Sequence, residues 1–324
     1  MSGGIVRVAA AVIIGPDGRV LLAQRPPGKA YAGYWEFPGG KLEAGETPRH
    51  ALDRELREEL GLTVRHAVPW LVQRYRYPHA HVELHFFRVF AWDGEPTGHD
   101  GQAHAWQAPG RFEVAPLLPA NTVVLRSLLL PPVYGITMAG KLGEENFLAR
   151  ARPALDRGLK LIELREKDWP ITRQRMFAAS LDALARPYGA SILLNGAAEH
   201  AREWHCGGVH WTAATLAAAT ARPADLRCAA SCHTREEIEH AAALGLDFVV
   251  LGPILPTPSH PGVITLGWDG FARIAAQAPL PIYALGGLGH GDLDLAMTHG
   301  AHGVALRRAA WDLSLVENAV AATR

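Results

Sequence analysis

The sequence lacks long apolar runs, a surplus of either charge and paired cysteines, and each absence narrows what the chain can be. It has 32 basic and 32 acidic side chains among 324 residues, so its formal net charge is zero. That balance gives no bulk attraction to nucleic acid or to an anionic membrane. No apolar run reaches transmembrane length, and the first residues lack the basic region and cleavage site of a signal peptide. We therefore expect a cytoplasmic protein that binds neither nucleic acid nor membrane.

Cysteine is scarce and unpaired by spacing. The chain has 3 cysteines, Cys206, Cys228 and Cys232, without a CxxC pattern. This usage predicts reduced thiols, as in a cytosolic protein. Cys228 and Cys232 could form a metal site with the adjacent His233, but small buried apolar side chains are the simpler interpretation.

The length allows two domains of ordinary size. We place the division between domains 1–130 and 131–324, because Pro131-Pro132 would stop a short helix over Val123–Leu130 before a new strand begins. The first domain has an α+β pattern, with one helix between its second and third strands. Its expected strands are Val6–Ile14, Val20–Arg25, Ala67–Tyr77 and Val82–Ala91.

The second domain alternates short apolar strands with helix-sized segments. A count of eight such units predicts a compact α/β TIM barrel, and an open doubly wound sheet is the alternative. The expected strands are Val133–Met138, Leu161–Arg165, Ser191–Asn195, Gly208–Trp211, Arg227–Ser231, Phe248–Gly252, Ile282–Gly286 and Gly303–Leu306.

The most informative segment is GGKLEAGETPRHALDRELREELGL, from Gly39 to Leu62. Thr47 is a good N-cap and Pro48 a good first helical residue, so a helix should begin here. Gly61 is placed to end that helix in a left-handed conformation. An apolar stripe at helical spacing is formed by Ala51, Leu52, Leu56 and Leu60.

Three carboxylates of this helix, Glu55, Glu58 and Glu59, are spaced so that they can project to one side. A divalent cation would relieve their repulsion, and Mg²⁺ takes few protein carboxylates together with substrate phosphates. The carbonyl group of Gly40 is a further candidate metal ligand. Arg54 can brace a carboxylate, and with Glu55 and Glu58 it forms the candidate catalytic set. The alternative is a solvated acidic helix face paired with basic neighbours.

The segment resembles the Nudix box. Together with WEFPGGK (Trp35–Lys41), the GEP…G…GQ…W stretch (Gly94–Trp106) and PAN (Pro119–Asn121), the resemblance extends over residues 5 to about 130 to MutT-type Nudix hydrolases. It implies hydrolysis of a nucleoside triphosphate with Mg²⁺, or Mn²⁺ as the alternative. The implied reaction converts 8-oxo-dGTP to 8-oxo-dGMP and pyrophosphate, which serves nucleotide-pool sanitation and DNA repair.

By matching position, the resemblance implies that Arg25 and Phe37 contact the nucleotide and that Asn121 hydrogen-bonds the purine. Asn121 could instead form an Asx-turn or cap the last helix. Two departures are visible: Ala105 replaces a glutamate of the relatives, and His79-Ala80 replaces the Asp-Arg of their base-recognition loop. In the relatives the replaced glutamate is a candidate metal ligand or base, and we expect Glu55, Glu58 or solvent to take over that role. We expect purine selectivity to be broader than in the relatives or to be built differently.

In the second domain, polar side chains gather at the expected strand ends, where a TIM barrel has its catalytic mouth. Arg165 and Lys167 alternate on one face and suit an anionic substrate. The pair Gly286-Gly287 would expose backbone N–H groups to a phosphate. Rim salt bridges are the alternative for the charged residues. The other members are Glu163, Asn195, His210, Ser231, His233 and Arg307.

The motifs ELREK, GGVHW, SCHT, GPILPTPSHPG and ALGGL resemble the thiamine phosphate synthase/TenI family over residues 133 to 310. The synthases need aspartates for Mg²⁺, where this chain has Gly196 and Thr215. Glu163 and His260 replace a glutamine and a lysine of their motifs, so we expect no synthase activity.

The TenI-like branch is associated with thiazole tautomerisation, and His233 matches the histidine implicated there. A buried, hydrogen-bonded histidine at a strand end is the alternative for that residue. A further possibility is a non-catalytic barrel that binds a phosphate metabolite, with thiazole phosphate or thiamine phosphate as the candidate ligand, and that regulates or scaffolds the hydrolase. The fusion also leaves open a Nudix enzyme that acts on a thiamine-related pyrophosphate.

Overall fold

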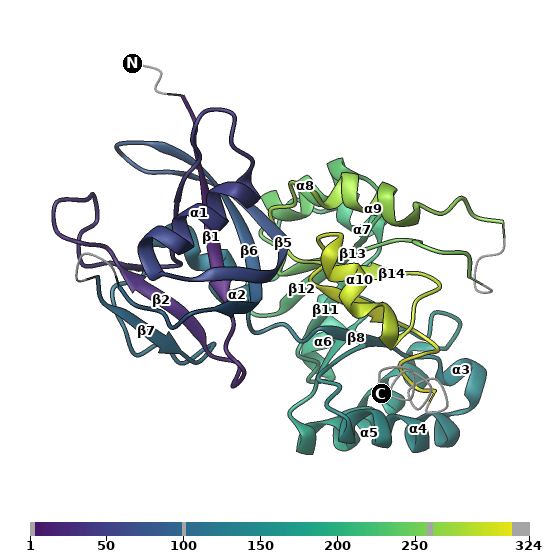
Figure 1. Cartoon of the computed structure of the whole chain (residues 1–324). Coiled ribbons are helices and arrows are strands. Elements are labelled where there is room, and N and C mark those ends of the chain that lie inside the picture. The colour runs from purple at the N-terminus through teal and green to yellow at the C-terminus, as the bar shows by residue number, and fades with distance from the viewer. Residues whose placement is uncertain (1–3, 99–101, 258–261, 313–324) are drawn as a thin grey trace. The chain divides into compact units, whose positions relative to one another are not determined.

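The computed structural model describes residues 4–98, 102–257 and 262–312. The chain divides into two compact units, each shown in Figure 1. One unit is Met1–Leu129 with Ala276–Pro279, and the other is Leu130–Ala275 with Leu280–Arg324. We keep 1–130 and 131–324 as the proposed domains and describe each unit by itself.

The first unit contains two sheets, with strand orders β4-β1-β6-β5 and β3-β2-β7. Strand β1 runs parallel to β6 and antiparallel to β4. The strands are β1 (Val6–Ile13), β2 (Val20–Gln24), β3 (Trp35–Glu36), β4 (Gly39–Lys41), β5 (Thr63–Arg76), β6 (His81–Asp93) and β7 (His104–Gln107). The helices are α1 (Pro48–Leu60), the 3-10 turn η2 (Pro119–Asn121) and α2 (Thr122–Ser127).

Strand β1 is apolar on both faces because it lies between two packed layers. On one face Ala9 packs in a cluster with Leu56 of α1. On the other face Ala10 packs in a second cluster with Val124 of α2. Successive side chains of a strand point to opposite faces, so a strand without polar alternation is expected when both faces are covered.

Helix α1 forms as its local sequence predicts. The hydroxyl of Thr47 accepts a hydrogen bond from the backbone N–H of His50 at 3.2 Å. Gly61 ends the helix with φ 68°. The predicted stripe of Ala51, Leu52, Leu56 and Leu60 is buried. Apolar anchoring on one side leaves the acidic residues of the helix on the other side.

The second unit is a closed barrel of parallel strands in the order β10-β11-β12-β13-β14-β15-β8-β9. The TIM-barrel prediction is confirmed, and the open-sheet alternative is wrong. The strands are β8 (Val133–Ile136), β9 (Leu161–Leu164), β10 (Ser191–Leu194), β11 (Gly208–Trp211), β12 (Arg227–Cys232), β13 (Phe248–Leu251), β14 (Ile282–Leu285) and β15 (Gly303–Leu306).

Short helices follow most barrel strands and cover the outside of the barrel (Figure 1). They are α3 (Ala139–Leu142), α4 (Glu144–Asp156), α5 (Ile171–Ala185), α6 (Ala198–Glu203), α7 (Ala213–Ala218), α8 (Arg235–Ala243), α9 (Gly267–Ala275) and α10 (Leu293–Thr298), with 3-10 turns η3 (Arg186–Tyr188) and η4 (His290–Asp292). Across the described ranges, no helix is both long enough and apolar enough to cross a membrane.

Aromatic and aliphatic side chains fill the barrel interior. Tyr134, Phe248 and Tyr283 belong to one buried cluster with Leu161. Polar groups in this interior include His210, which is hydrogen-bonded to Tyr134 and Ser231, in agreement with the general rule that buried polar atoms are paired. The barrel residues that carry chemistry therefore stand on a packed core and not around an open pore.

Candidate active site

Arg54 is the hub of the ion pairs on α1. Its Nε and Nη2 atoms donate to the two carboxylate oxygens of Glu46 at 3.1 and 2.9 Å. Its Nη1 atom donates to Glu55 at 2.9 Å and to Glu58 at 3.2 Å. The hydrogen bonds to Glu46 are the main reason why the pKa of Arg54 is raised. One guanidinium thus holds carboxylates from both the helix and the loop before it.

Two glycines of β4 make room for this arrangement. A Cβ atom at Gly40 would lie 2.0 Å from the Cδ atom of Glu55. A Cβ atom at Gly39, where φ is 144°, would lie 2.1 Å from the carbonyl oxygen of Ala9. Only glycine at position 40 lets the Glu55 carboxylate lie against the backbone of the strand.

Glu59 lies at the more buried end of the carboxylate cluster. Burial raises the pKa of Glu59 to about 6, and the negative charge of Glu55 adds to the rise. A hydrogen bond with the backbone of Gly39 acts in the opposite direction. The Glu58 side chain, in contrast, is 60% exposed. The helix therefore presents two partly buried carboxylates and one exposed carboxylate that Arg54 connects to Glu55.

No three His, Cys, Asp or Glu side chains in the described part of the chain form a ready-made metal site. The donor set nevertheless fits a hard divalent cation, because Glu55 and Glu59 bring negative charge together beside backbone that only glycine permits. Glu58 would have to leave Arg54 to join them. That exposed ion pair is worth about 0–1 kcal/mol, far less than cation coordination supplies.

Arg25 and Glu36 form a partly buried ion pair between β2 and β3 of the first unit. The Nη1 atom of Arg25 lies 2.7 Å from each carboxylate oxygen of Glu36. Burial raises the pKa of Glu36 although Arg25 opposes the rise. The ring of Phe37 is 3% exposed and packs edge-to-face on Phe86 at 5.9 Å. Phe37 thus supports the site from the core, and its ring has no open face for stacking on a base.

Asn121 carries an unsatisfied polar group. The residue is 2% exposed, and within the described ranges its Nδ2 atom has no hydrogen-bond partner. It precedes α2, but its side chain makes no capping hydrogen bond, so the N-cap alternative is wrong. A buried amide left without a partner costs about 1–3 kcal/mol. A ligand that accepts this hydrogen bond would remove that penalty.

Tyr77 connects the two ends of the site. Burial raises its pKa to about 12, the backbone of Ala120 hydrogen-bonds it, and the charges of Glu36 and Arg25 both act on it. Glu36 also acts on Glu59. The carboxylate cluster, the Arg25–Glu36 ion pair and Tyr77 are therefore near enough for their charges to act on one another. Sequence reasoning missed Tyr77, because an aromatic residue at the end of a strand carries no signal of its own.

Backbone pairing holds these parts in register. The N–H of Leu118 donates to the carbonyl of Trp35 at 2.9 Å, which ties the segment before Asn121 to β3.

The structure also places two of the residues that depart from the pattern of the MutT-type relatives. Ala105 lies in β7 opposite Leu22. His79 lies in the turn after β5, with its ring 5.5 Å from that of Tyr77.

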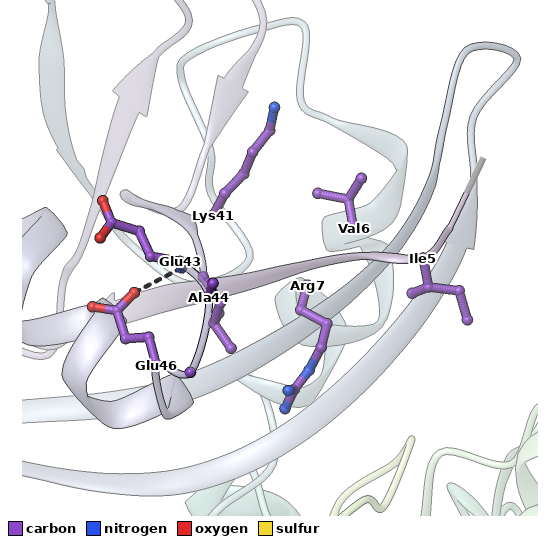
Figure 2. Close-up of a pocket in the computed structure, with 9 residues that line it drawn as sticks. Ile5, Val6, Arg7, Lys41, Glu43, Ala44 and Glu46 are labelled. Atoms are coloured by element: carbon purple, nitrogen blue, oxygen red, sulfur yellow. Dashed lines mark hydrogen bonds between the residues drawn. The ribbon is translucent and has the colours of Figure 1, made fainter.

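A groove lies between the start of β1 and the loop that follows β4 (Figure 2). The backbone N–H of Glu43 donates to Glu46 there at 2.9 Å. Neither Glu55 nor Glu59 lines the groove, so we do not place the reaction in it. Its lining is Ile5, Val6, Arg7, Lys41, Leu42, Glu43, Ala44, Gly45 and Glu46.

The barrel gathers cations at the strand ends. Burial lowers the pKa of Lys167, and Arg165 lowers it further. Burial and Arg165 also lower the pKa of Arg307, whose Nε atom has no hydrogen-bond partner among the described residues. The carboxylate of Glu163 is 2% exposed and accepts a hydrogen bond from Asn195 at 2.8 Å. Arg165, Lys167 and Arg307 thus lie near one another, and the carboxylates of Glu163, Glu166 and Asp168 act on the same group.

A buried hydrogen-bonded row crosses the barrel interior. The hydroxyl of Tyr134 lies 3.1 Å from Nδ1 of His210, and Nε2 of His210 lies 2.9 Å from the hydroxyl of Ser231. Burial lowers the pKa of His210. His233 is exposed and not buried, and its Nδ1 atom hydrogen-bonds the carbonyl oxygen of Gly252 at 2.9 Å. The buried-histidine alternative for His233 is therefore wrong.

The glycine pair of the barrel serves close packing. Gly286 and Gly287 have φ values of 112° and 71°, and Cβ atoms there would lie 2.8 Å from Pro253 and 2.7 Å from Leu255. These contacts are enough to require glycine at both positions. The binding of a phosphate by their backbone N–H groups stays a prediction. His260 lies outside the described residues.

The cysteines are free and buried. Burial raises the pKa to about 11 for Cys206 and to about 12 for Cys228 and Cys232. Unionised buried thiols of this kind behave as small apolar side chains.

Comparison with known proteins matches each unit to a separate family. Residues 4–127 match the Nudix domain and residues 133–310 match thiamine monophosphate synthase. An 8-oxo-dGTP diphosphatase of Haemophilus influenzae is 38% identical over 40% of this chain and 95% of its own length. A CTP pyrophosphohydrolase of Escherichia coli is 39% identical over 37% of this chain and 88% of its own length. A thiamine-phosphate synthase of Thermosynechococcus vestitus is 32% identical over 57% of this chain and 52% of its own length.

The chain belongs to the Nudix family through its first unit and to the thiamine monophosphate synthase family through its barrel. The first unit is a Nudix hydrolase. Nudix hydrolases generally use divalent metal ions, which agrees with the donor set on α1.

We predict that Gly40→Ala lowers turnover by about 10- to 100-fold while the fold is kept, because the added methyl group must displace the Glu55 carboxylate. Turnover of a nucleoside triphosphate and far-UV circular dichroism of the full chain measure the two effects. Gly4→Ala is the matched control, since a Cβ atom there meets nothing within 4 Å. Unchanged turnover in a folded Gly40→Ala protein would show that the close approach of Glu55 to Gly40 is not needed for activity.

We also predict that Glu59→Gln stabilises the metal-free protein at pH 7.5 and has no such effect near pH 4.5. The folded protein holds the pKa of Glu59 at about 6, above its ordinary 4.5. The free energy of unfolding therefore decreases as the pH rises from about 4.5 to above about 6. Glutamine cannot ionise, so the variant avoids this decrease. Thermal melts in a chelating buffer at several pH values measure the difference. Glu95→Gln, on an exposed residue, is the control, and a pH-independent difference would contradict the assignment.

Proposed function

We propose that the first unit is a Mg²⁺-dependent nucleoside triphosphate pyrophosphohydrolase that converts 8-oxo-dGTP to 8-oxo-dGMP and pyrophosphate. The observation that carries this proposal is a pair of features in one unit: the carboxylates that Arg54 and Gly40 organise, and the buried Asn121 amide, whose Nδ2 atom has no partner among the described residues. A nucleoside triphosphate has matching groups, because its phosphates would bind a metal ion held by the carboxylates and its base would hydrogen-bond the amide of Asn121. The 8-oxo-dGTP diphosphatase of H. influenzae supports the choice of nucleotide. The role would be nucleotide-pool sanitation and DNA repair.

At the phosphate end, Glu55, Glu58, Glu59 and the carbonyl of Gly40 would hold the metal ion. The bound ion would neutralise phosphate charge and lower the pKa of a water molecule. Arg54 fixes the direction of Glu55 by its 2.9 Å hydrogen bond. Glu58 is exposed, so it can take a proton from the attacking water and pass it to solvent.

At the base end, the amide of Asn121 can donate to and accept from a purine edge. Arg25 is held by Glu36 at 2.7 Å, so its guanidinium has a defined position from which to contact the nucleotide. Phe37 holds this region by core packing. The three residues therefore have different tasks, and only Asn121 reads the base edge.

The substrate is tested with the purified full chain in Mg²⁺ by measuring pyrophosphate release from 8-oxo-dGTP, dGTP and CTP, and phosphate release from thiamine pyrophosphate. A kcat/KM that is highest for 8-oxo-dGTP supports the proposal. A CTP preference would favour the activity named for the E. coli relative. A preference for thiamine pyrophosphate would favour a thiamine-related hydrolase, the alternative that the fused barrel suggests. No release from any of them would contradict the reaction class.

We predict that Glu58→Gln abolishes hydrolysis and leaves the fold intact. The amide keeps the size of the side chain and its hydrogen-bonding oxygen, but it removes the negative charge and the proton acceptor. Turnover and the melting temperature of the variant test this, with Glu95→Gln as an exposed control that should keep full activity. A folded variant with near-normal turnover would exclude Glu58 from the catalytic set.

For the second unit we propose a barrel that binds a phosphorylated metabolite of the thiazole or thiamine phosphate class at its mouth. The unpartnered Nε of Arg307 beside Arg165 and Lys167 supports this proposal, because an anion would satisfy it. Titration calorimetry of thiazole phosphate with the full chain tests it. Proton transfer by His233, which would make the barrel a tautomerase, is the alternative and is tested by isomer conversion in the same mixture.

We predict that the full chain forms no thiamine phosphate from a pyrimidine pyrophosphate and a thiazole phosphate. Gly196 and Thr215 supply no carboxylate for Mg²⁺, and the buried charge of Glu163 would repel a pyrophosphate group. Product formation in vitro, and rescue of a host that lacks its synthase, are the measurements. Rescue by the full chain would overturn this expectation.

A further inference from the structure

Three aromatic rings of the first unit form a wall beside the base end of the site. We call Tyr31, Tyr77 and His79 the aromatic wall. The ring of Tyr31 lies 5.1 Å from that of Tyr77 and 5.8 Å from that of His79. Tyr77 and His79 stack at 5.5 Å with an interplanar angle of 29°. The three rings therefore contact one another in a closed triangle.

The aromatic wall adjoins the groups that the site already contains. Tyr77 is hydrogen-bonded by the backbone of Ala120, the residue before Asn121. The loop that carries Tyr31 is tied to Arg25, whose Nε atom donates to the carbonyl oxygen of Ala30 at 2.7 Å. Both flanks of the wall thus end at residues assigned to nucleotide binding.

The rings are not equally buried. Tyr77 is 8% exposed, whereas Tyr31 is partly exposed and His79 is exposed. Buried Tyr77 is the support, and the outer rings have surface available to a ligand. Aromatic side chains with one buried support and open outer rings provide a platform on which a planar base can stack.

The backbone of Tyr31 gives an independent sign of function. Its φ is 59°, in the left-handed region that glycine and asparagine adopt readily and bulky residues avoid. In the same loop Gly28 and Gly33 adopt positive φ values without that penalty. The strained turn is held by a hydrogen bond from the N–H of Tyr34 to the carbonyl of Tyr31 at 3.1 Å. A large ring kept where a small residue would fold more easily points to a role for the ring itself.

We propose that the aromatic wall is the stacking surface for the nucleobase, with Tyr31 as the ring that covers the base. This inference rests on the proposed nucleotide hydrolysis and adds how the base is held. Stacking uses the π-face that every base has, so the wall contributes affinity for purines and pyrimidines alike. Selection among bases then falls to the amide of Asn121, whose Nδ2 is unpartnered within the described ranges.

The test uses Tyr31→Asn and Tyr31→Phe in the full chain. Asparagine accepts the left-handed backbone but removes the ring, and phenylalanine keeps the ring. We expect Tyr31→Asn to raise KM for dGTP, 8-oxo-dGTP and CTP by roughly 5- to 150-fold, the range of one base–aromatic stack. The kcat should change little, and the melting temperature should stay equal or rise because the strain is relieved. Tyr31→Phe should keep the KM of the unaltered chain.

Inorganic triphosphate, which has no base, separates stacking from damage to the phosphate end. Its hydrolysis should be equal in the unaltered chain and in Tyr31→Asn. An unchanged nucleotide KM in Tyr31→Asn, or a lower melting temperature with equal losses for all substrates, would overturn the stacking role. If the unaltered chain hydrolyses none of these nucleotides, the proposed function fails instead, and that outcome is seen before any variant is made.

Discussion

The first unit depends on the way in which Arg54 holds its carboxylates. Glu46, Glu55 and Glu58 would repel one another, and one guanidinium bonded to all three makes the cluster compatible with a folded protein. Gly40 adds a steric requirement, because the Glu55 carboxylate occupies the space that a side chain at position 40 would need. Charge and space are therefore organised together, and the pKa of Glu59 is raised mainly by burial and further by the negative charge of Glu55.

From that cluster the site extends along the unit in a fixed order. Glu36 acts electrostatically on Glu59, is paired with Arg25, and acts on Tyr77. Tyr77 in turn lies beside the backbone of Ala120, the residue before Asn121. Our proposal assigns a polyphosphate to the carboxylate end of this path and a planar base to the Asn121 end. The path is assembled from separate parts of the sequence, which the two sheets bring together.

The barrel is organised on a different principle. Its buried polar groups are satisfied in pairs, as in Asn195 with Glu163 and Ser231 with His210. Its cations at the strand ends are not all satisfied, and Arg307 keeps an unpartnered Nε atom in the described part of the chain. The unpartnered Nε atom is the feature on which the proposed binding of an anionic ligand rests.

The sequence by itself determined the elements whose causes are local. Thr47 and Gly61 limit α1 by capping chemistry, its stripe follows the helical period, and the barrel strands are short apolar runs. Strands β3, β4 and β7 have two to four residues, too few to show a period. Only the tertiary structure decided that Phe37 is covered, that His233 is exposed and that Tyr77 reaches the Asn121 region. These outcomes depend on contacts between distant segments, and no local spacing encodes such contacts.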